Sequence, residues 1–149
     1  HFDSKEAFAA QIIRNYAVWM DRRWEAIMAD APEDPLDALR HLFNAFIAHH
    51  EQASCPGCLV GNFAAEVSET SDTCRTELAH VMSQWRERLA ELIERAQQAG
   101  RIRTDLPAPT LSAFFWDSWE GAVLRMKVEH SAQPLRDAAS LMLDTFFRP

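Results

Sequence analysis

The sequence predicts an all-α domain built around one hydrophobic core. Only four of the 149 residues are glycine, while strong helix formers such as Ala, Leu, Glu, Arg and Gln are abundant and β-branched residues are scattered. Apolar residues recur at steps of three and four along most of the chain, which is the period of an amphipathic helix. With 48% hydrophobic residues, a chain of this length can bury roughly two thirds of the surface that it exposes when unfolded.

The first helix is expected over residues 4–29. Asp3 and Glu6 have the spacing of a capping box, and Ser4 is the alternative N-cap. Pro32 and Pro35 end this helix. Its apolar stripe consists of Phe8, Ile12, Tyr16, Trp19, Met20, Trp24 and Ile27.

A second helix is expected over 35–50, followed by a turn at Ser54–Gly57, because proline and glycine are typical of turns. A short third helix is expected over 58–69, where apolar residues gather on one side. The oxygen-bearing side chains of Thr70–Asp72 then supply a cap for the next helix.

The remaining chain predicts three more helices, which gives six. The fourth, over 72–99, has the longest regular amphipathic pattern and ends at Gly100, a residue that favours the left-handed conformation of a C-cap. Prolines open the fifth helix, over 107–127, and the sixth, over 134–146. The fifth is apolar over more than half of its circumference, so it must be buried on two sides.

Charge and composition narrow the possible functions. The formal net charge of −7 repels a phosphate backbone, so this chain itself is not expected to bind DNA. No apolar stretch approaches the ~20 residues of a membrane span, so we expect a cytoplasmic protein without membrane contact. The sequence contains no paired carboxylates, Ser-His-Asp order, HExxH pattern or phosphate loop, so it indicates neither an enzyme nor a cofactor.

The three cysteines are Cys55, Cys58 and Cys74, too few for a disulfide scaffold. The Cys55–Cys58 segment is a CxxC, but no strand precedes it, as a thioredoxin-like enzyme would require. Cys55 and Cys58 could also bind zinc together with His49 and His50, although the second half of such a site has no recognisable spacing.

Cys58 has two opposing interpretations. It lies at or just before the first turn of the third helix, where free backbone amides and the helix dipole favour a reactive thiolate. Alternatively, it is a small buried thiol that fills space in a helical core. Cys74, in the fourth helix, is expected to be structural.

Aromatic residues suggest a binding pocket. Such rings line sites for planar or apolar ligands, although solid core is the alternative for each of them. The candidate pocket residues are Tyr16, Trp19, Phe46, Phe63, Trp85 and Trp119. Glu66 and Glu120 interrupt apolar segments and could orient a polar ligand, or they could simply face water.

Several motifs resemble a known family. The first eight residues, His1–Phe8, resemble the junction of TetR-family repressors, where the recognition helix ends in an aromatic segment and a Ser/Asn-Lys-Glu/Asp helix start follows. The later segments are similar to the branch of that family that responds to reactive electrophiles and acrylate-like compounds, the N-ethylmaleimide-reductase repressor type. These segments are Gly57–Asn62, Ala65–Val67, Ala96–Gly100, Gly121, Lys127 and Pro134–Leu135.

This resemblance implies a six-helix ligand-binding and dimerisation domain over 1–149, in which 1–3 are the trailing end of an N-terminal helix-turn-helix domain absent from the sequence. Operator DNA would be bound through that domain, and Lys5 is expected near the DNA backbone. The effector would be a small apolar or electrophilic molecule. Cys58 would be the sensing thiol, activated by Lys127, which matches a lysine of the branch, with Cys55 as its resolving partner.

The last two helices are expected to form a four-helix bundle with their copies in a homodimer. The residues expected at this interface are Gly121, Leu124, Leu141, Met142 and Phe146. Two other classes stay open: a stand-alone helical binding or adaptor domain, and a small enzyme that uses Cys58.

Overall fold

The computed structural model describes residues 4–52 and 57–149. Within these ranges the backbone forms six α-helices, one short π-helical turn and no strand, which confirms the all-α prediction. The elements are α1 (Lys5–Ala29), α2 (Pro35–Gln52), α3 (Leu59–Val67), α4 (Asp72–Gln98), α5 (Ala108–Glu129), α6 (Gln133–Leu141) and the π-helical turn η1 (Met142–Phe146).

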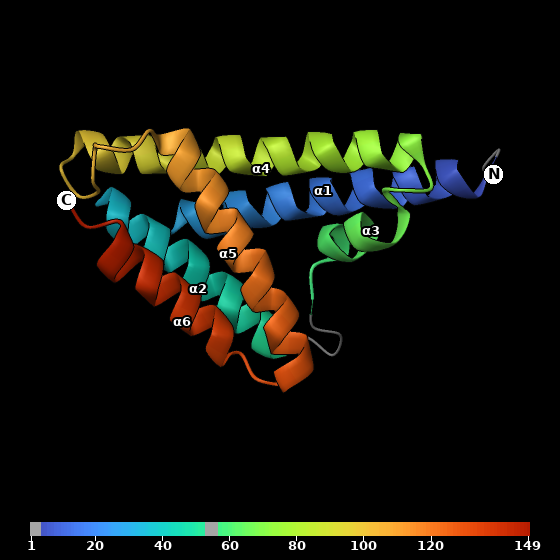
Figure 1. Cartoon of the computed structure of the whole chain (residues 1–149). Coiled ribbons are helices and arrows are strands. Elements are labelled where there is room, and N and C mark those ends of the chain that lie inside the picture. The colour runs from blue at the N-terminus through green and yellow to red at the C-terminus, as the bar shows by residue number, and fades with distance from the viewer. Residues whose placement is uncertain (1–3, 53–56) are drawn as a thin grey trace.

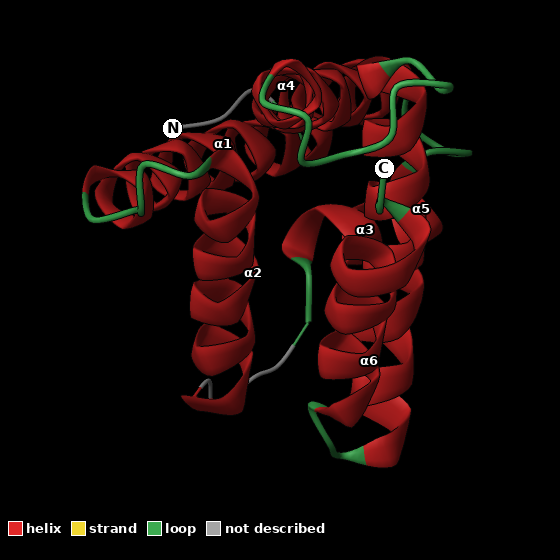
Figure 2. Ribbon diagram, turned by 90° about the vertical axis from the view of Figure 1, so that its left-hand side faces the viewer, coloured by secondary structure: helices red, strands yellow, loops and turns green. Residues whose placement is uncertain are grey.

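The helices form a long upper layer and a second layer that converges beneath it. α1 and α4 lie side by side and run in the same direction along one edge of a roughly triangular outline (Figure 1). α5 crosses this pair obliquely, and α2 and α6 continue the second layer (Figures 1 and 2). α3 is a short separate helix that packs mainly on α4 and α1, and its first turn lies near Glu120 and Lys127 of α5.

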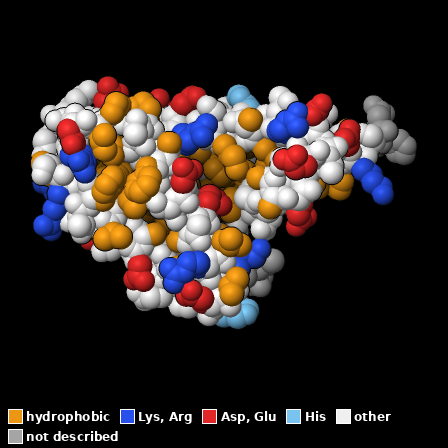
Figure 3. All heavy atoms as spheres, in the orientation of Figure 1, with side chains coloured by type: hydrophobic (Ala, Val, Ile, Leu, Met, Phe, Trp, Pro, Cys, Tyr) orange, Lys and Arg blue, Asp and Glu red, His pale blue; other side chains and the backbone are white. Residues whose placement is uncertain are grey.

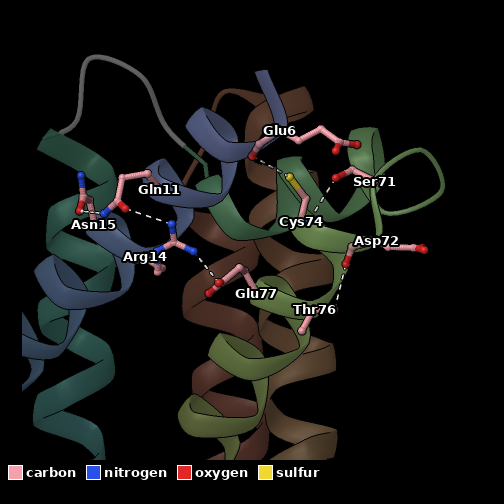
Figure 4. Close-up of polar contacts among 9 residues, drawn as sticks. All are labelled: Glu6, Gln11, Arg14, Asn15, Ser71, Asp72, Cys74, Thr76 and Glu77. Carbon is pink, nitrogen blue, oxygen red and sulfur yellow. Dashed lines mark hydrogen bonds and ion pairs between the residues drawn. The ribbon is translucent and has the colours of Figure 1, made fainter. Parts of the chain in front are cut away.

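Polar contacts join α1 to α4 near their N-termini. Arg14 and Glu77 form an ion pair at 2.5 Å. The Cys74 thiol donates to the carbonyl oxygen of Glu6 at 3.9 Å, as Figure 4 shows. Cys74 is 1% exposed, so this thiol lies inside the seam between the two helices.

The helix ends follow local sequence signals. The Ser4 side chain is the N-cap of α1 and accepts a hydrogen bond from the Ala7 amide at 3.1 Å, whereas Asp3 lies outside the described residues. Gly100 has a φ of +68°, as expected for a left-handed C-cap. α3 is shorter than the expected 58–69, because residues 68–70 form a turn, closed by a bond from the Thr70 amide to the Val67 carbonyl at 3.1 Å, and Ser71 is already the extended N-cap of α4.

The sixth helix differs from the expected continuous helix over 134–146. After Leu141 it widens into η1, which closes with a bond from the Phe147 amide to the Met142 carbonyl at 2.8 Å. A π-helical turn holds one residue more than an α-helical turn. Phe147 lies in the core after this turn, with its ring centre 5.9 Å from that of Phe115. Phe146, beside it, packs at 5.1 Å on Phe114.

Phe43 of α2 lies at the centre of the hydrophobic core. Its side chain is fully buried, and its ring centre lies 4.2 Å from that of Phe115 and 5.0 Å from that of Trp119. The core therefore depends on contact between α2 and α5. Among the described helices, none combines the length and the apolar character that a bilayer span requires.

Replacing Phe43 with alanine is expected to lower the free energy of unfolding by about 3–5 kcal/mol, because it removes a fully buried ring and leaves a cavity. Urea unfolding followed by tryptophan fluorescence measures this loss. Val18→Ala is the control: Val18 is 50% exposed on α1, and its replacement should change stability by no more than about 0.5 kcal/mol. Equal effects of the two substitutions would contradict this description of the core.

Candidate functional site

A small pocket lies where α1, α2, α4 and α5 meet the N-terminal end of α3. Its volume is about 40 Å³, which is room for about three water molecules. The lining residues are Tyr16, Met20 and Arg23 of α1, Phe46, His49 and His50 of α2, Gly57 and Cys58 before α3, Trp85 of α4, and Trp116, Trp119 and Glu120 of α5. The pocket therefore has aromatic walls and several ionisable groups.

The structure brings together four of the six aromatic residues proposed for a pocket: Tyr16, Phe46, Trp85 and Trp119. Trp19 lies outside it. Its side chain is 42% exposed, and its ring centre is 5.6 Å from that of His49. Phe63 is half-buried and packs against the core without lining the pocket.

Other lining residues were not proposed for the pocket from the sequence, although their helical spacing relative to the proposed ones indicates the same face. Residues three, four or seven positions apart share a helix face. Met20 and Arg23 follow Tyr16 by four and seven positions, and the two histidines follow Phe46 by three and four. Trp116 precedes Trp119 by three positions. The helical spacing was therefore visible in the sequence, but nothing in it indicated that the polar side chains of Arg23, His49 and His50 face inward.

Three groups form the polar end of the pocket: the half-buried Tyr16 hydroxyl and Glu120 carboxyl, and the buried Cys58 thiol. Burial is the main cause that raises the pKa of all three, because a low-dielectric site disfavours the charged form. For Cys58, burial and the nearby Glu120 raise the pKa to about 12. The neighbouring Cys58 thiol partly opposes the rise in the pKa of Glu120.

Arg23 and the two histidines form the basic side of the pocket. Burial and the Arg23 charge lower the pKa of His49, while burial, His49 and Arg23 lower that of His50. The Nε atom of Arg23 is buried and has no hydrogen-bond partner within the described part of the chain. An arginine keeps its charge in a protein, so this side of the pocket presents a cation with a free donor.

Lys127, expected to activate the Cys58 thiol, has a hydrogen-bond partner on α3 other than that thiol. Its ammonium donates to the Oδ1 atom of Asn62 at 3.0 Å, and its side chain passes beside Gly57. Cys58 is the N-cap of α3 and accepts from the amide of Gly61 at 3.5 Å, which favours a thiolate. Burial and Glu120 outweigh that contribution and favour the neutral thiol.

Cys55 lies outside the described residues, so two hypotheses that involve it have no structural description here. These are its part as a resolving thiol and the zinc site with His49, His50 and Cys58. In residues 4–52 and 57–149, no three His, Cys, Asp or Glu side chains are grouped as a metal ion would require. Glu66 is exposed, whereas Glu120 lines the pocket.

Comparison with known proteins identifies the family to which this arrangement corresponds. Residues 35–142 match the model of the family described as "Tetracyclin repressor-like, C-terminal domain". The chain belongs to this family. It thus represents the C-terminal domain of the TetR family, in agreement with the resemblance seen in its motifs.

Two curated proteins are similar over most of the chain. The HTH-type transcriptional repressor DhaR of Mycobacterium sp. (strain GP1) is 39% identical over 135 residues, which are 91% of this chain and 67% of DhaR. The transcriptional regulator AcuR of Cereibacter sphaeroides is 34% identical over 139 residues, which are 91% of this chain and 62% of AcuR. The chain therefore spans about two thirds of the length of these relatives.

Solved structures share the fold. The regulatory protein TetR from Rhodobacter sphaeroides superposes on this chain with a TM-score of 0.84 at 30% sequence identity. The superposition covers 97% of this chain and 77% of the Rhodobacter chain. The reduced form of NemR from E. coli has a TM-score of 0.83 at 20% identity, covering 95% of this chain and 74% of its own, and this likeness concerns the fold alone.

In this TetR-family domain, α5 and α6 expose an apolar stripe. Leu124 and Leu141 are 62% and 58% exposed, and Figure 3 shows hydrophobic side chains on this face of the molecule. Of the residues proposed for a dimer interface, Gly121 is also exposed and Phe146 is half-buried. Met142 differs, because it is buried in the core of its own chain and is only 8% exposed.

Alkylation of Cys58 by iodoacetamide is expected to accelerate about tenfold per pH unit from pH 7 to 10 without levelling off. The thiolate is the reactive form, and its fraction follows pH as long as pH stays below the pKa of about 12. Mass spectrometry of the Cys58 peptide measures the rate. Free cysteine, with a pKa of about 8.5, is the reference in the same tube and should level off. A Cys58 rate that levels off near neutral pH would show an activated thiol instead.

Proposed function

We propose that the chain is the effector-sensing and dimerisation part of a ligand-responsive transcriptional repressor. Operator DNA would be bound through an N-terminal helix-turn-helix domain of the full protein. Membership of the TetR family and 39% identity to a transcriptional repressor support this assignment. The net charge of −7 fits a sensing domain better than a surface that binds DNA.

The observation that carries the sensing proposal is the pocket with the unpaired Arg23 Nε. A buried donor without an acceptor costs about 1–3 kcal/mol, and a ligand oxygen would remove that cost. The aromatic walls would hold the apolar part of the ligand. The effector class that fits is therefore a small aromatic or unsaturated molecule with an anionic or carbonyl group directed at Arg23.

α1 is the element through which binding would be transmitted. Three of its residues line the pocket, and an ion pair at 2.8 Å between Asp21 and Arg88 couples it to α4. A ligand that contacts Arg23 differently in two positions of α1 would shift the balance between them. Because α1 leads back to the N-terminus, this shift would change the spacing of two DNA-binding domains in a dimer.

Reversible binding is the sensing mode that the pocket favours over covalent modification. Cys58 lines the pocket, so an electrophile bound there would meet its sulfur. The neutral state of the thiol, however, leaves little nucleophile at neutral pH. Sensing of electrophiles through Cys58, with Cys55 and Lys127, is the second candidate, and a pH profile that levels off near neutrality would favour it.

Benzoate is larger than the pocket of about 40 Å³, so the pocket must widen to admit it; we expect benzoate then to quench the fluorescence of the pocket tryptophans with a saturable binding curve. Arg23→Met should weaken its binding by about 10- to 100-fold, because a hydrogen bond between charged groups contributes about 1.5–3 kcal/mol. Arg22→Met is the matched control, since Arg22 is the exposed neighbour on the same helix. Neutral benzyl alcohol is a second probe of the same size. Equal weakening of benzoate binding by both variants, or quenching that saturates with neither probe, would contradict the proposed pocket.

Leu124→Glu and Leu141→Glu are each expected to convert a dimer into monomers at micromolar concentration. Each substitution places a charge in the centre of an apolar interface, for which we expect more than ~1,200 Å² of buried surface. Sedimentation velocity measures the mass. Val18→Glu, on the exposed face of α1, should leave the dimer intact. Wild-type protein that sediments as a monomer would refute dimerisation through α5 and α6.

A further inference from the structure

The inner pocket is too small to be a complete effector site. Its volume of about 40 Å³ compares with roughly 300–1,000 Å³ for typical small-molecule sites. The ligand site of the proposed function can reach that size only by joining neighbouring space.

A surface groove between α3 and α5 offers that space. Its volume is about 320 Å³. α3 and the residue before it contribute one side, and α5 contributes the other, including Gly121 and Leu124. Cys58 and Glu120 line both this groove and the inner pocket. These two side chains are therefore the wall between the groove and the pocket.

Gly61 shows how closely this wall is fitted. A Cβ atom at Gly61 would lie 2.7 Å from the Oε2 atom of Glu120, closer than such atoms approach in proteins. The carboxyl group thus occupies the space that a side chain at position 61 would need. At Gly121, on the α5 side of the groove, an added Cβ would meet nothing within 4 Å. The missing side chain at Gly61 thus gives the Glu120 carboxyl room to close the wall, and the missing side chain at Gly121 leaves the groove open.

The wall is weakly held. Glu120 lies beside the Cys58 thiol in both the pocket and the groove, and a thiol is a weak hydrogen-bond donor. None of the ion pairs formed by the described residues includes Glu120. A ligand N–H or O–H group would donate to the Glu120 carboxyl more strongly than the thiol does.

We propose that Cys58 and Glu120 form a movable gate, and that the effector binds across it, from the α3–α5 groove into the aromatic pocket. The ligand class that fits is an elongated, mainly apolar molecule with an N–H or O–H donor that replaces the Cys58 thiol on Glu120. This proposal rests on the proposed function, because it concerns the same pocket. Gly121 and Leu124 border the groove and also lie on the exposed stripe of α5, so a bound ligand would touch the proposed dimer face.

Differential alkylation of Cys58 in the intact chain tests the gate without an effector. Iodoacetamide is small and monobromobimane is bulky, and both react with the same thiolate. The ratio of the two rates therefore reports access to Cys58 and is independent of its pKa. Cleavage after glutamate places Cys74 on a different peptide from Cys58, and fragment-ion masses separate Cys58 from Cys55. Cys74, buried at the α1–α4 seam, reports general loosening of the fold.

Gly61→Ala should displace Glu120 and raise the bimane-to-iodoacetamide ratio at Cys58 at least fivefold, with Cys74 unchanged. Gly121→Leu should fill the groove and lower this ratio at least fivefold, whereas Gly121→Ala, its smaller matched control, should lower it less than twofold. An unchanged ratio in Gly61→Ala or in Gly121→Leu would overturn the gate. If Gly61→Ala also exposes Cys74, Glu120→Ala replaces it with the same expected rise, and an unchanged ratio there is equally decisive.

Sedimentation of Gly121→Leu separates a filled groove from an altered dimer, since a filled groove lowers the ratio at unchanged mass. A lowered ratio that accompanies a changed mass would count against the groove as the route. The benzoate titration is independent of these rates. Saturable benzoate binding with unchanged alkylation ratios would retain the sensing pocket and reject the gate, and the reverse pattern would reject the benzoate site while retaining the gate.

Discussion

The crossing of α4 and α5 is the contact on which the rest of the site depends. The Ser112 hydroxyl donates to the carbonyl oxygen of Arg86 at 2.6 Å, and the Trp116 indole donates to that of Trp85 at 3.1 Å. Both side chains are buried, and an unsatisfied donor in such a place would cost about 1–3 kcal/mol. These bonds fix the position of α5 along α4. They thereby place Trp119 and Glu120 at the pocket.

Burial then sets the charges of the pocket. Tyr16, Cys58 and Glu120 lie in a low-dielectric environment that raises the pKa of each, so each is driven toward its neutral form. Arg23 cannot lose its proton in the same way. The pocket consequently combines neutral donors and acceptors at one end with a permanent cation at the other, and this difference is the physical basis on which we propose an effector with an acceptor group directed at Arg23.

The fold could be predicted from the sequence in most respects because its signals are local. Ser4, Gly100 and the prolines mark helix ends by short-range hydrogen bonds and backbone geometry. The π-helical turn after Leu141 could not be predicted in this way. It forms because widening the helix buries Phe147 against Phe115, a contact between residues far apart in the sequence.

The candidate site was only partly predictable for the same reason. Aromatic residues at helical spacing indicated a pocket, but the stripe on α1 contains both Trp19 and Tyr16. A repeating pattern cannot say how far around the helix the neighbours reach. In the structure Tyr16 faces inward and Trp19 lies at the edge beside His49. Met142, the first residue of η1, likewise continues the apolar pattern that precedes it in α6, yet it is buried in its own core.

The sequence by itself determined the helices, their order and the place of Cys58 at the start of α3, because these follow from hydrogen bonds and apolar periods within a few residues. Only the tertiary structure decided the state of that thiol. The N-terminus of a helix favours a thiolate, but Glu120, which comes from another helix, and the surrounding side chains favour the neutral form. Because solvation and charge depend on neighbours in space, the chemistry of Cys58 was decided by the side chains of other helices that bury it, Glu120 of α5 among them.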